Sequence, residues 1–452
     1  MKRFLFCIAL ICGMTFGTAH AQAALTNIDE ALKVAQARQL PVFVDFSAVW
    51  CHSCHEMDDK VLNGADWDKR QSRFVLVRSD ADGTNGVAWM KKLNVPALPA
   101  YIVLNPDGNE RGRLTGEIPR AKFYPALDRL LSGQDALAAL KIAAARGSTQ
   151  AAAKVLHAYD ERDQQQEGLD WFAKLPEAER KAVQGNADAS MRLAIVQAHA
   201  EKNKMYFSQP KLAAGVHAKV AKDCRAHALQ ALGGPIGLDD RFDVASTLLA
   251  CARDLPPPQR KVIASAQLPV LKALYDKNVP TASSGTLREA TYTLAWYYKA
   301  LGDSANEKAT YARAIAIGRK ALDDGHGNLD VKRDRSMVEV LSEFLGRKGP
   351  EAENTAVLKA MAAAWPDDFF CQYMYGKDLL KHDKAAEALP YLEYASKHTT
   401  PAWGLSTAYA QAKALVALHR RPEAEKLFNA ALRQAEKQFP EITKYQKMGM
   451  KL

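Results

Sequence analysis

Cysteine, long apolar segments and blocks of like charge are all scarce in this sequence. Seven cysteines in 452 residues are too few to staple a scaffold of this length, so stability must come from ordinary hydrophobic cores. Beyond the N-terminus no run approaches the roughly 20 apolar residues that a membrane-spanning helix needs. The formal net charge is +10, but both signs are interspersed. This pattern argues against a nucleic-acid partner and favours a mildly basic surface that suits acidic partners or a membrane face.

The N-terminus has the features of an export signal. Lys2 and Arg3 precede an apolar stretch from Phe4 to Phe16, and Ala19-His20-Ala21 offers a small-x-small cleavage site. This arrangement is typical of a secretory signal peptide, which we assign to residues 1–21. The alternative, a transmembrane anchor, needs a longer apolar run. We therefore expect a mature chain without a membrane span in the periplasm, where disulfides form and persist.

Between residues 22 and 135, helical patterns alternate with short apolar runs. This alternation predicts an α/β layer fold for a first domain. The expected helices cover 27–38, 51–61, 87–93 and 120–131, the expected strands 41–46, 74–77, 101–104 and 110–114, and a hairpin turn 105–108.

Six consecutive residues, Trp50-Cys51-His52-Ser53-Cys54-His55, allow two chemistries. As Trp-Cys-x-x-Cys they form a dithiol motif, and as Cys-x-x-Cys-His they match a c-type haem attachment site with His55 as axial ligand. A cytochrome c domain is all-helical, whereas this motif follows a strand-like run, so the dithiol is favoured. His55 then belongs to the helix surface. A zinc site using His52 or His55 lacks a second pair of ligands at finger-like spacing, so we expect neither metal nor cofactor.

Three features together carry a family resemblance. Asp45 lies six residues before Cys51, Trp50 introduces the Cys-x-x-Cys motif, and Pro99 ends the segment Val95-Pro96-Ala97-Leu98-Pro99. In this order and spacing they resemble a thioredoxin fold, most similar to thioredoxin-like domains of periplasmic reductases such as the C-terminal domain of DsbD. The resemblance implies that Asp45 is a buried acid and that Pro99 is a cis-proline beside the substrate backbone. Ala97 and Ala100 depart from the family pattern.

The chemistry of thiol exchange suggests a role for each residue. At a helix N-terminus, Cys51 is favoured as a thiolate and should be an exposed nucleophile, while Cys54 is more buried and resolves the mixed disulfide. Burial would raise the pKa of Asp45 toward neutrality and make it a proton acceptor for Cys54. Asp58 either shares this task or is a solvated helix residue. A histidinium at His52 would stabilise the thiolate and make the pair more oxidising, so the motif leaves the direction of electron flow open.

Residues 136–452 show helical spacing with almost no strand-like alternation. From 285 to 435, small and large residues recur in units about 34 to 47 residues apart, which resembles tetratricopeptide (TPR) repeats. We expect an all-α, TPR-like second domain that either binds a client or partner or serves as a spacer or dimerisation module. Cys224 and Cys251 are candidates for a structural disulfide, which would leave Cys371 as a free buried thiol. The recurring positions are Leu294, Ala295, Tyr298, Tyr311 and Ala314; Leu341, Leu345, Leu358, Met361 and Pro366; Gly376, Leu379, Ala388, Leu392 and Ala395; and Ala412, Leu415, Ala424, Phe428 and Ala431.

Two functions are consistent with this sequence. The first is a periplasmic thiol-disulfide oxidoreductase, more a reductase or isomerase than an oxidase, that acts on protein thiols and disulfides with an unidentified redox partner. The segment between Cys54 and Pro99 is too short for the helical insertion of DsbA-type oxidases, which supports that direction. The second is a non-catalytic interaction protein whose dithiol senses the redox state.

Overall fold

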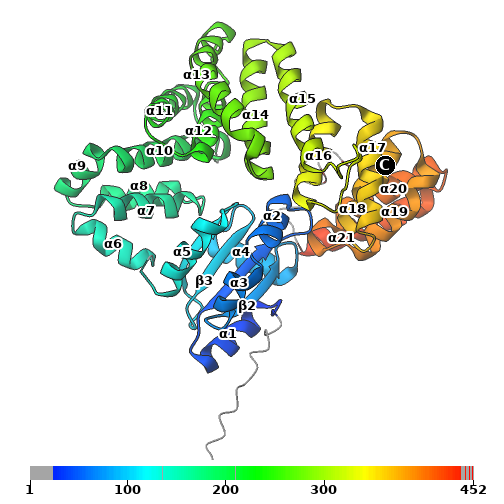
Figure 1. The fold of residues 1–452 in the computed structure, drawn as a ribbon, viewed down its shortest axis with the longest axis horizontal. Helices are drawn as coiled ribbons and strands as arrows, with labels where there is room; N and C mark the ends of the chain where they lie inside the picture. Colours follow the sequence, from blue (N-terminus) through cyan, green and yellow to red (C-terminus); the bar gives the residue numbers. More distant parts are fainter. Residues whose placement is uncertain are drawn as a thin grey trace, which may run out of the picture.

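The computed structural model describes residues 24–134, 136–208 and 210–438, together with 443, 447 and 450. The predicted signal peptide, residues 1–21, lies outside them. The described chain has two parts, a small α/β part and a long arc of helices (Figure 1). The predicted fold class, α/β followed by all-α, is confirmed. The domain boundary predicted after residue 135 falls between α5 (Arg120–Leu131) and α6 (Leu137–Ala145).

A four-stranded mixed sheet organises the first part, with strand order β2-β1-β3-β4. Strand β1 pairs in parallel with β2 and antiparallel with β3, and β3 pairs antiparallel with β4. The central strands β1 and β3 are almost wholly buried, which explains their continuous apolar sequences. The strands are β1 (Val42–Ser47), β2 (Val75–Asp80), β3 (Ala100–Leu104) and β4 (Glu110–Thr115).

Side chains of β1 alternate between two cores, one on each face of the sheet. Val42, Val44 and Phe46 pack with residues of α1 and α4. Phe43 points to the other face, where it packs with Trp67 of α3 and with residues of α2 and α5. This packing fixes the position of α2 relative to the sheet, so the N-terminus of α2 lies close to the carboxyl end of β1. The helices are α1 (Ile28–Arg38), α2 (His52–Lys60), α3 (Gly64–Gln71), α4 (Thr84–Leu93) and α5.

The second part consists of helices that pack mainly against their sequence neighbours, such as α18 with α19 and α20 with α21. At Gly376 an added Cβ would lie 2.7 Å from the Leu392 side chain, so a larger residue would force α18 and α19 to repack. Small residues thus serve the role that the repeat pattern predicts. The helices are α6, α7 (Thr149–Asp160), α8 (Gln165–Ala173), α9 (Glu177–Gly185), α10 (Ala187–Phe207), α11 (Ala214–Leu232), α12 (Leu238–Cys251), α13 (Pro257–Asn278), α14 (Ser284–Leu301), α15 (Ser304–Ala321), α16 (Arg335–Lys348), α17 (Glu351–Ala364), α18 (Phe369–Lys381), α19 (Ala385–His398), α20 (Gly404–Ala417) and α21 (Arg421–Gln438), with short 3-10 helices η1 (Val279–Thr281) and η2 (Pro401–Trp403).

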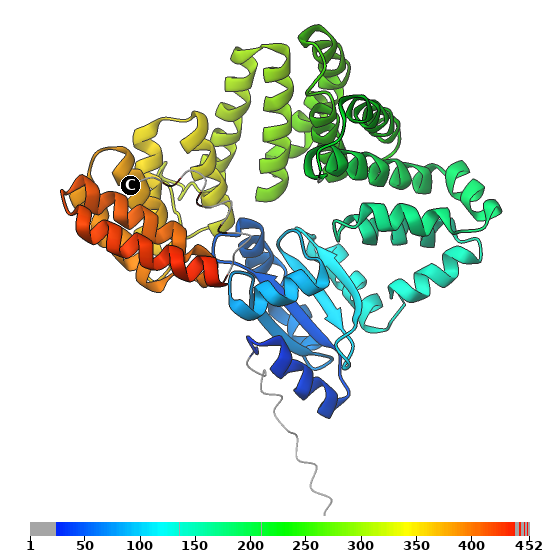
Figure 2. The ribbon, with the colours of Figure 1, turned by 180° about the vertical axis from the view of Figure 1, so that it is seen from behind.

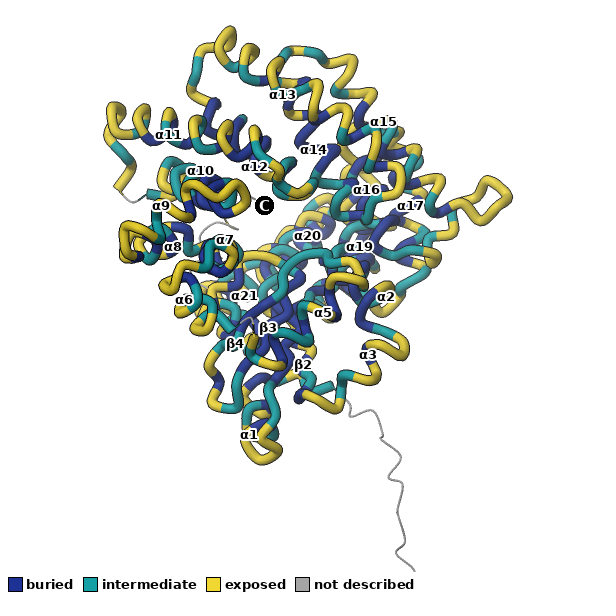
Figure 3. The backbone as a smooth tube through the Cα atoms, turned by 60° about the vertical axis from the view of Figure 1, so that its left-hand side comes forward, coloured by how far each residue is buried: buried dark blue, intermediate teal, exposed yellow. Residues whose placement is uncertain are grey.

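The arc of helices curves back onto the α/β part. It leaves the sheet after α5 and returns so that α14 and α16 contact α2 (Figures 1 and 2). The central strands β1 and β3 are buried along most of their length, whereas many loops that join the helices are exposed (Figure 3). Within the described residues, no helix is both long enough and apolar enough to cross a membrane. Because α2 carries the Cys-x-x-Cys motif at its start, this contact brings the helical array to the dithiol.

Candidate active site

Cys51 and Cys54 lie where β1 passes through a loop into α2, and they form a disulfide with their Cα atoms 5.2 Å apart. Cys51 is the N-cap residue of α2. Its sulfur accepts a hydrogen bond from the Cys54 N–H at 3.2 Å. Helix-start N–H groups that point at this sulfur stabilise negative charge on it. The geometry therefore suits Cys51 as the attacking sulfur.

Both sulfur-bearing residues are buried, which corrects the expectation of an exposed Cys51. Cys51 is 4% exposed and Cys54 is 3% exposed. The loop that precedes them lies against the helical array. Arg335 of α16 donates to the Val49 C=O at 3.3 Å, and the Trp50 ring lies 6.5 Å from that of Trp403 in η2. Sequence spacing alone cannot show that residues so far along the chain pack on the loop before Cys51.

The segment before β3 forms the other side of the dithiol. The Leu98-Pro99 peptide bond is cis, and Leu98 packs against the cluster that contains both cysteines. The Pro99 C=O accepts from the Gly116 N–H at 2.9 Å, whereas within the described residues neither backbone group of Leu98 makes a hydrogen bond. Leu98 thus leaves a donor and an acceptor for an extended chain that lies beside the cysteines.

Asp45 is a buried acid in β1, 2% exposed. Burial, reinforced by the nearby Asp58 carboxyl, raises its pKa to about 7. Asp58 is half-buried in α2 and forms an ion pair with Arg78 at 3.1 Å; burial raises its pKa as well. Asp58 is therefore not the solvated residue of one sequence alternative, and Asp45 can take up a proton near neutral pH.

The two histidines of the motif differ from expectation. In the disulfide form, burial, with Arg288 nearby, lowers the pKa of His52 to about 4, so His52 is neutral at pH 7 there, which does not favour the histidinium considered from the sequence. Burial and Arg335 likewise lower the pKa of His55 to about 4. Instead of lying on the helix surface, His55 donates from Nε2 to the Val49 C=O at 3.0 Å and lies 3.4 Å from Glu339 of α16. With its surroundings α/β and its ring engaged between the two parts, His55 does not support the haem alternative.

Several residues of the site were missed from the sequence. The Trp50 indole N–H donates to Asp82 at 2.6 Å, and Trp403 also hydrogen-bonds to Asp82, whose pKa burial raises to about 6. Further out, Lys60 at the end of α2 pairs with Asp334 at 2.8 Å. Asp82 follows β2 and could have been noticed as a carboxylate at a strand end. Trp403 and Asp334 give no local signal, because they come from distant helices.

The remaining cysteines lie in the helical array. Cys224 of α11 and Cys251 of α12 form a disulfide, with Cα atoms 6.1 Å apart. Cys371 is a free, buried thiol whose pKa burial raises. None of the three contacts the dithiol cluster, which consists of residues from the α/β part alone.

Comparison with known proteins agrees with this geometry. A family model described as "Thioredoxin-like" matches residues 23–106. The N-terminal part of the chain is therefore a thioredoxin-like domain, and the resemblance inferred from its motif is confirmed.

Similar proteins include thiol:disulfide interchange proteins. The thiol:disulfide interchange protein DsbD of Cronobacter sakazakii is 36% identical over 113 residues, which cover 24% of this chain and 19% of the relative. The thiol:disulfide interchange protein TxlA of Synechococcus elongatus is 31% identical over 120 residues, covering 26% of this chain and 60% of the relative. The chain thus spans about a fifth of the length of the DsbD proteins it matches.

A solved structure aligns with the longer part of the chain. The TPR domain of P58(IPK) covers 73% of this chain and 98% of its own, with 15% identity and a TM-score of 0.19. So low a score supports no further comparison.

Proposed function

We propose that this protein is a periplasmic thiol-disulfide oxidoreductase that acts on client proteins through Cys51 and Cys54, as a reductase or isomerase. The observation that carries the proposal is the placement of Cys51 at the N-terminus of α2, directly beside the unpaired backbone of Leu98. A nucleophilic sulfur and an edge for an extended chain are what disulfide exchange with a protein requires.

The first step starts from the reduced dithiol. The Cys51 thiolate attacks one sulfur of a client disulfide, a mixed disulfide forms, and the second client sulfur leaves as a thiolate that takes up a proton. The Leu98 backbone holds the client segment in extended form. The helix N-terminus stabilises the thiolate before attack.

The second step releases the client. Asp45, whose pKa of about 7 keeps part of its population ionised at neutral pH, accepts the proton of the Cys54 thiol. The Cys54 thiolate then attacks the Cys51 sulfur, the Cys51–Cys54 disulfide forms, and the remaining client sulfur departs. The client disulfide has gained two electrons, and a dithiol protein must return two electrons to the enzyme. An isomerase ends instead when a client thiol attacks the mixed disulfide.

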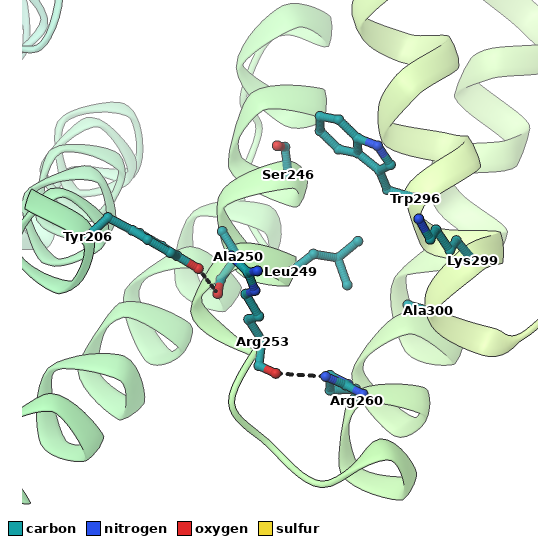
Figure 4. A pocket seen from close by; sticks show the side chains of 9 residues that line it. All are labelled: Tyr206, Ser246, Leu249, Ala250, Arg253, Arg260, Trp296, Lys299 and Ala300. Carbon is teal, nitrogen blue, oxygen red and sulfur yellow. Dashed lines mark hydrogen bonds between the residues drawn. The ribbon is translucent and has the colours of Figure 1, made fainter. Parts of the chain in front are cut away.

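The helical array would recruit the client or a partner protein. A cavity of about 750 Å³ opens between α10, α12, α13 and α14, lined by Arg253, Arg260 and Lys299 and by the half-exposed rings of Tyr206 and Trp296 (Figure 4). None of these three cations forms an ion pair within the described part of the chain. Such a surface suits an acidic segment that carries apolar residues.

Covalent trapping tests the proposed function. Cys54→Ser removes the resolving thiol, so client proteins should accumulate as mixed disulfides on Cys51 in the exporting cell, and the wild-type protein should reduce insulin with dithiothreitol as electron source. If no client is trapped and insulin is not reduced, the oxidoreductase function is wrong. Arg253→Glu combined with Lys299→Glu should lower the yield of trapped clients while insulin reduction continues.

One observation favours a second candidate, a redox-sensing interaction protein. Both cysteines are nearly buried, and the helical array packs on their loop. In that case opening of the disulfide would change the contact between α2 and α16 without turnover. Insulin reduction at a rate that depends on Cys54 separates the enzyme from the sensor.

A further inference from the structure

We propose that a cavity between the dithiol loop and helices α16–α18 is a specificity subsite, which binds a large apolar side chain next to the reacting cysteine of the client. This inference rests on the proposed thiol exchange and adds to it the chemistry of the client. The helical array would then supply half of the substrate site as well as a remote recruiting surface.

The cavity is formed by segments about 300 residues apart in the chain. It has a volume of about 400 Å³, within the usual range of roughly 300–1,000 Å³ for ligand pockets. Trp50 and His52, which flank Cys51 on either side, form one wall. Leu358 and Met361 of α17 and Phe370 and Met374 of α18 form the facing apolar wall. Methionine side chains adapt to differently shaped apolar groups, so this wall fits leucine, methionine or phenylalanine.

The cavity lies beside Cys51, so the client residues next to the reacting cysteine can reach it. In an extended chain neighbouring residues are only about 3.3 Å apart along the strand. A client cysteine bonded to the Cys51 sulfur therefore places its flanking residues beside Trp50 and His52. The cavity is lined by both sequence neighbours of Cys51, so it offers a client side chain a place to enter beside the reacting cysteine.

One carboxyl oxygen in the cavity lacks a partner. The Glu339 side chain is 9% exposed; its Oε1 accepts from Arg335 at 3.1 Å, but its Oε2 has no hydrogen-bond partner within the described residues. A buried polar atom left unpaired costs about 1–3 kcal/mol. Burial raises the pKa of Glu339 to about 8, so the carboxyl is largely neutral at pH 7 and suits a backbone amide of the client better than a charged side chain.

Two of the other polar groups of the lining, Ser342 and Glu343, already have partners. Ser342 donates to the Asn354 side chain at 3.1 Å, and Glu343 accepts from Arg288 at 2.6 Å. Within the described residues, the Glu339 Oε2 atom and the neutral His52 ring are lining groups without a hydrogen-bond partner, and the facing wall is apolar. This composition suits an apolar side chain together with its backbone amide.

The test fills the cavity from α16 and leaves Cys51 in place. Gly346 lines the cavity in the last turns of α16, and a Cβ added there meets no atom closer than 3.6 Å. Gly346→Leu in the Cys54→Ser background would be reacted in reduced form with two peptides, each carrying one cysteine activated as a mixed disulfide with thionitrobenzoate. One peptide has leucine beside the cysteine and the other has serine, and release of the coloured thiolate gives the second-order rate constant.

The expected preference follows from apolar burial. Burying one leucine side chain contributes about 1.5–3 kcal/mol, so without the filling substitution the leucine peptide should react about tenfold faster or more. Gly346→Leu should reduce this ratio to about one. The matched control is Gly215→Leu in α11, where an added Cβ meets nothing within 4 Å, and this variant should retain the ratio.

Each outcome decides between the hypotheses. Equal rates for both peptides before the cavity is filled, or a preference that survives in Gly346→Leu, would overturn the subsite while leaving thiol exchange intact. No release from either peptide would overturn the proposed function and the subsite with it. Should Gly346→Leu lose its helical circular dichroism, Met374→Phe fills the same cavity from α18 and must reduce the ratio in the same way.

Discussion

Asp45→Asn should change how the stability of the α/β domain depends on pH. The folded pKa of Asp45 is about 7, whereas the ordinary value is 3.8. As the pH rises, the Asp45 carboxyl loses its proton at a lower pH in the unfolded chain than in the folded protein. Ionisation therefore stabilises the unfolded chain first and lowers the free energy of unfolding. The free energy of unfolding therefore carries no penalty from Asp45 below pH 3.8, and the penalty grows until the pH passes 7. At about 1.4 kcal/mol per pH unit, the whole penalty is about 4 kcal/mol, of which about 2.5 kcal/mol falls between pH 5 and 8.

Urea unfolding of the oxidised protein at pH 5 and pH 8, followed by tryptophan fluorescence, measures this effect. The difference in unfolding free energy between Asp45→Asn and wild type should shift by about 2.5 kcal/mol in favour of the variant at pH 8, because asparagine does not titrate. Asp107→Asn is the control. Hydrogen bonds from Asn109 lower the pKa of Asp107, which is therefore charged at both pH values, so its difference should stay constant. Wild-type and Asp45→Asn curves that remain parallel from pH 5 to 8 would refute the assignment of Asp45 as a buried acid with a raised pKa.

Three further predictions concern packing, the second disulfide and His52. Phe43 is fully buried among Trp67, Phe74 and Tyr101, so Phe43→Ala should lower the unfolding free energy of the α/β domain by about 3–5 kcal/mol in urea titrations, and a loss under 1 kcal/mol would contradict this packing. Replacing both Cys224 and Cys251 with alanine opens a loop of 27 residues and should cost the helical array about 3–4 kcal/mol relative to the oxidised wild type in thermal unfolding, whereas the variant and the reduced wild type should agree. Because His52 is neutral above pH 5, His52→Gln should leave the shape of the pH profile of Cys51 alkylation between pH 5.5 and 8 unchanged, and loss of an inflection near pH 6.5 would show a histidinium instead.

Much of the α/β fold was accessible from local patterns. The buried strands β1 and β3 are continuous apolar runs, and each lies within a residue or two of its predicted range. Helix α3 was not predicted, since its eight residues contain only one large apolar side chain, Trp67. Packing of that single tryptophan against Phe43 and Phe74 stabilises a helix that helix propensity alone does not predict.

The site divides in the same way into local and distant parts. Asp45, the cysteine pair and Pro99 could be found because their spacing along the chain reflects one strand, one turn and one loop. The neutral state of His52 could not be found, since its surroundings include Arg288 of α14 and Glu343 of α16, more than 230 residues further on. No local pattern specifies which helix returns to cover an active-site loop.

The neutral state of His52 bears on the direction of electron flow. A charge that stabilises the Cys51 thiolate stabilises the reduced form and makes the couple more oxidising, as in DsbA at about −120 mV. In the disulfide form, burial and the neighbouring Arg288 lower the pKa of His52 to about 4, which works against a histidinium and so against this contribution. Arg288 does not replace it, because its guanidinium is paired with Glu343 at 2.6 Å. The helix N-terminus remains as the main source of stabilisation, and thioredoxin, at about −270 mV, shows that a Cys-x-x-Cys pair can be strongly reducing. We therefore expect equilibration with glutathione to give a potential below about −180 mV, the value of protein disulfide isomerase, and a value near that of DsbA would contradict the proposed reductase or isomerase.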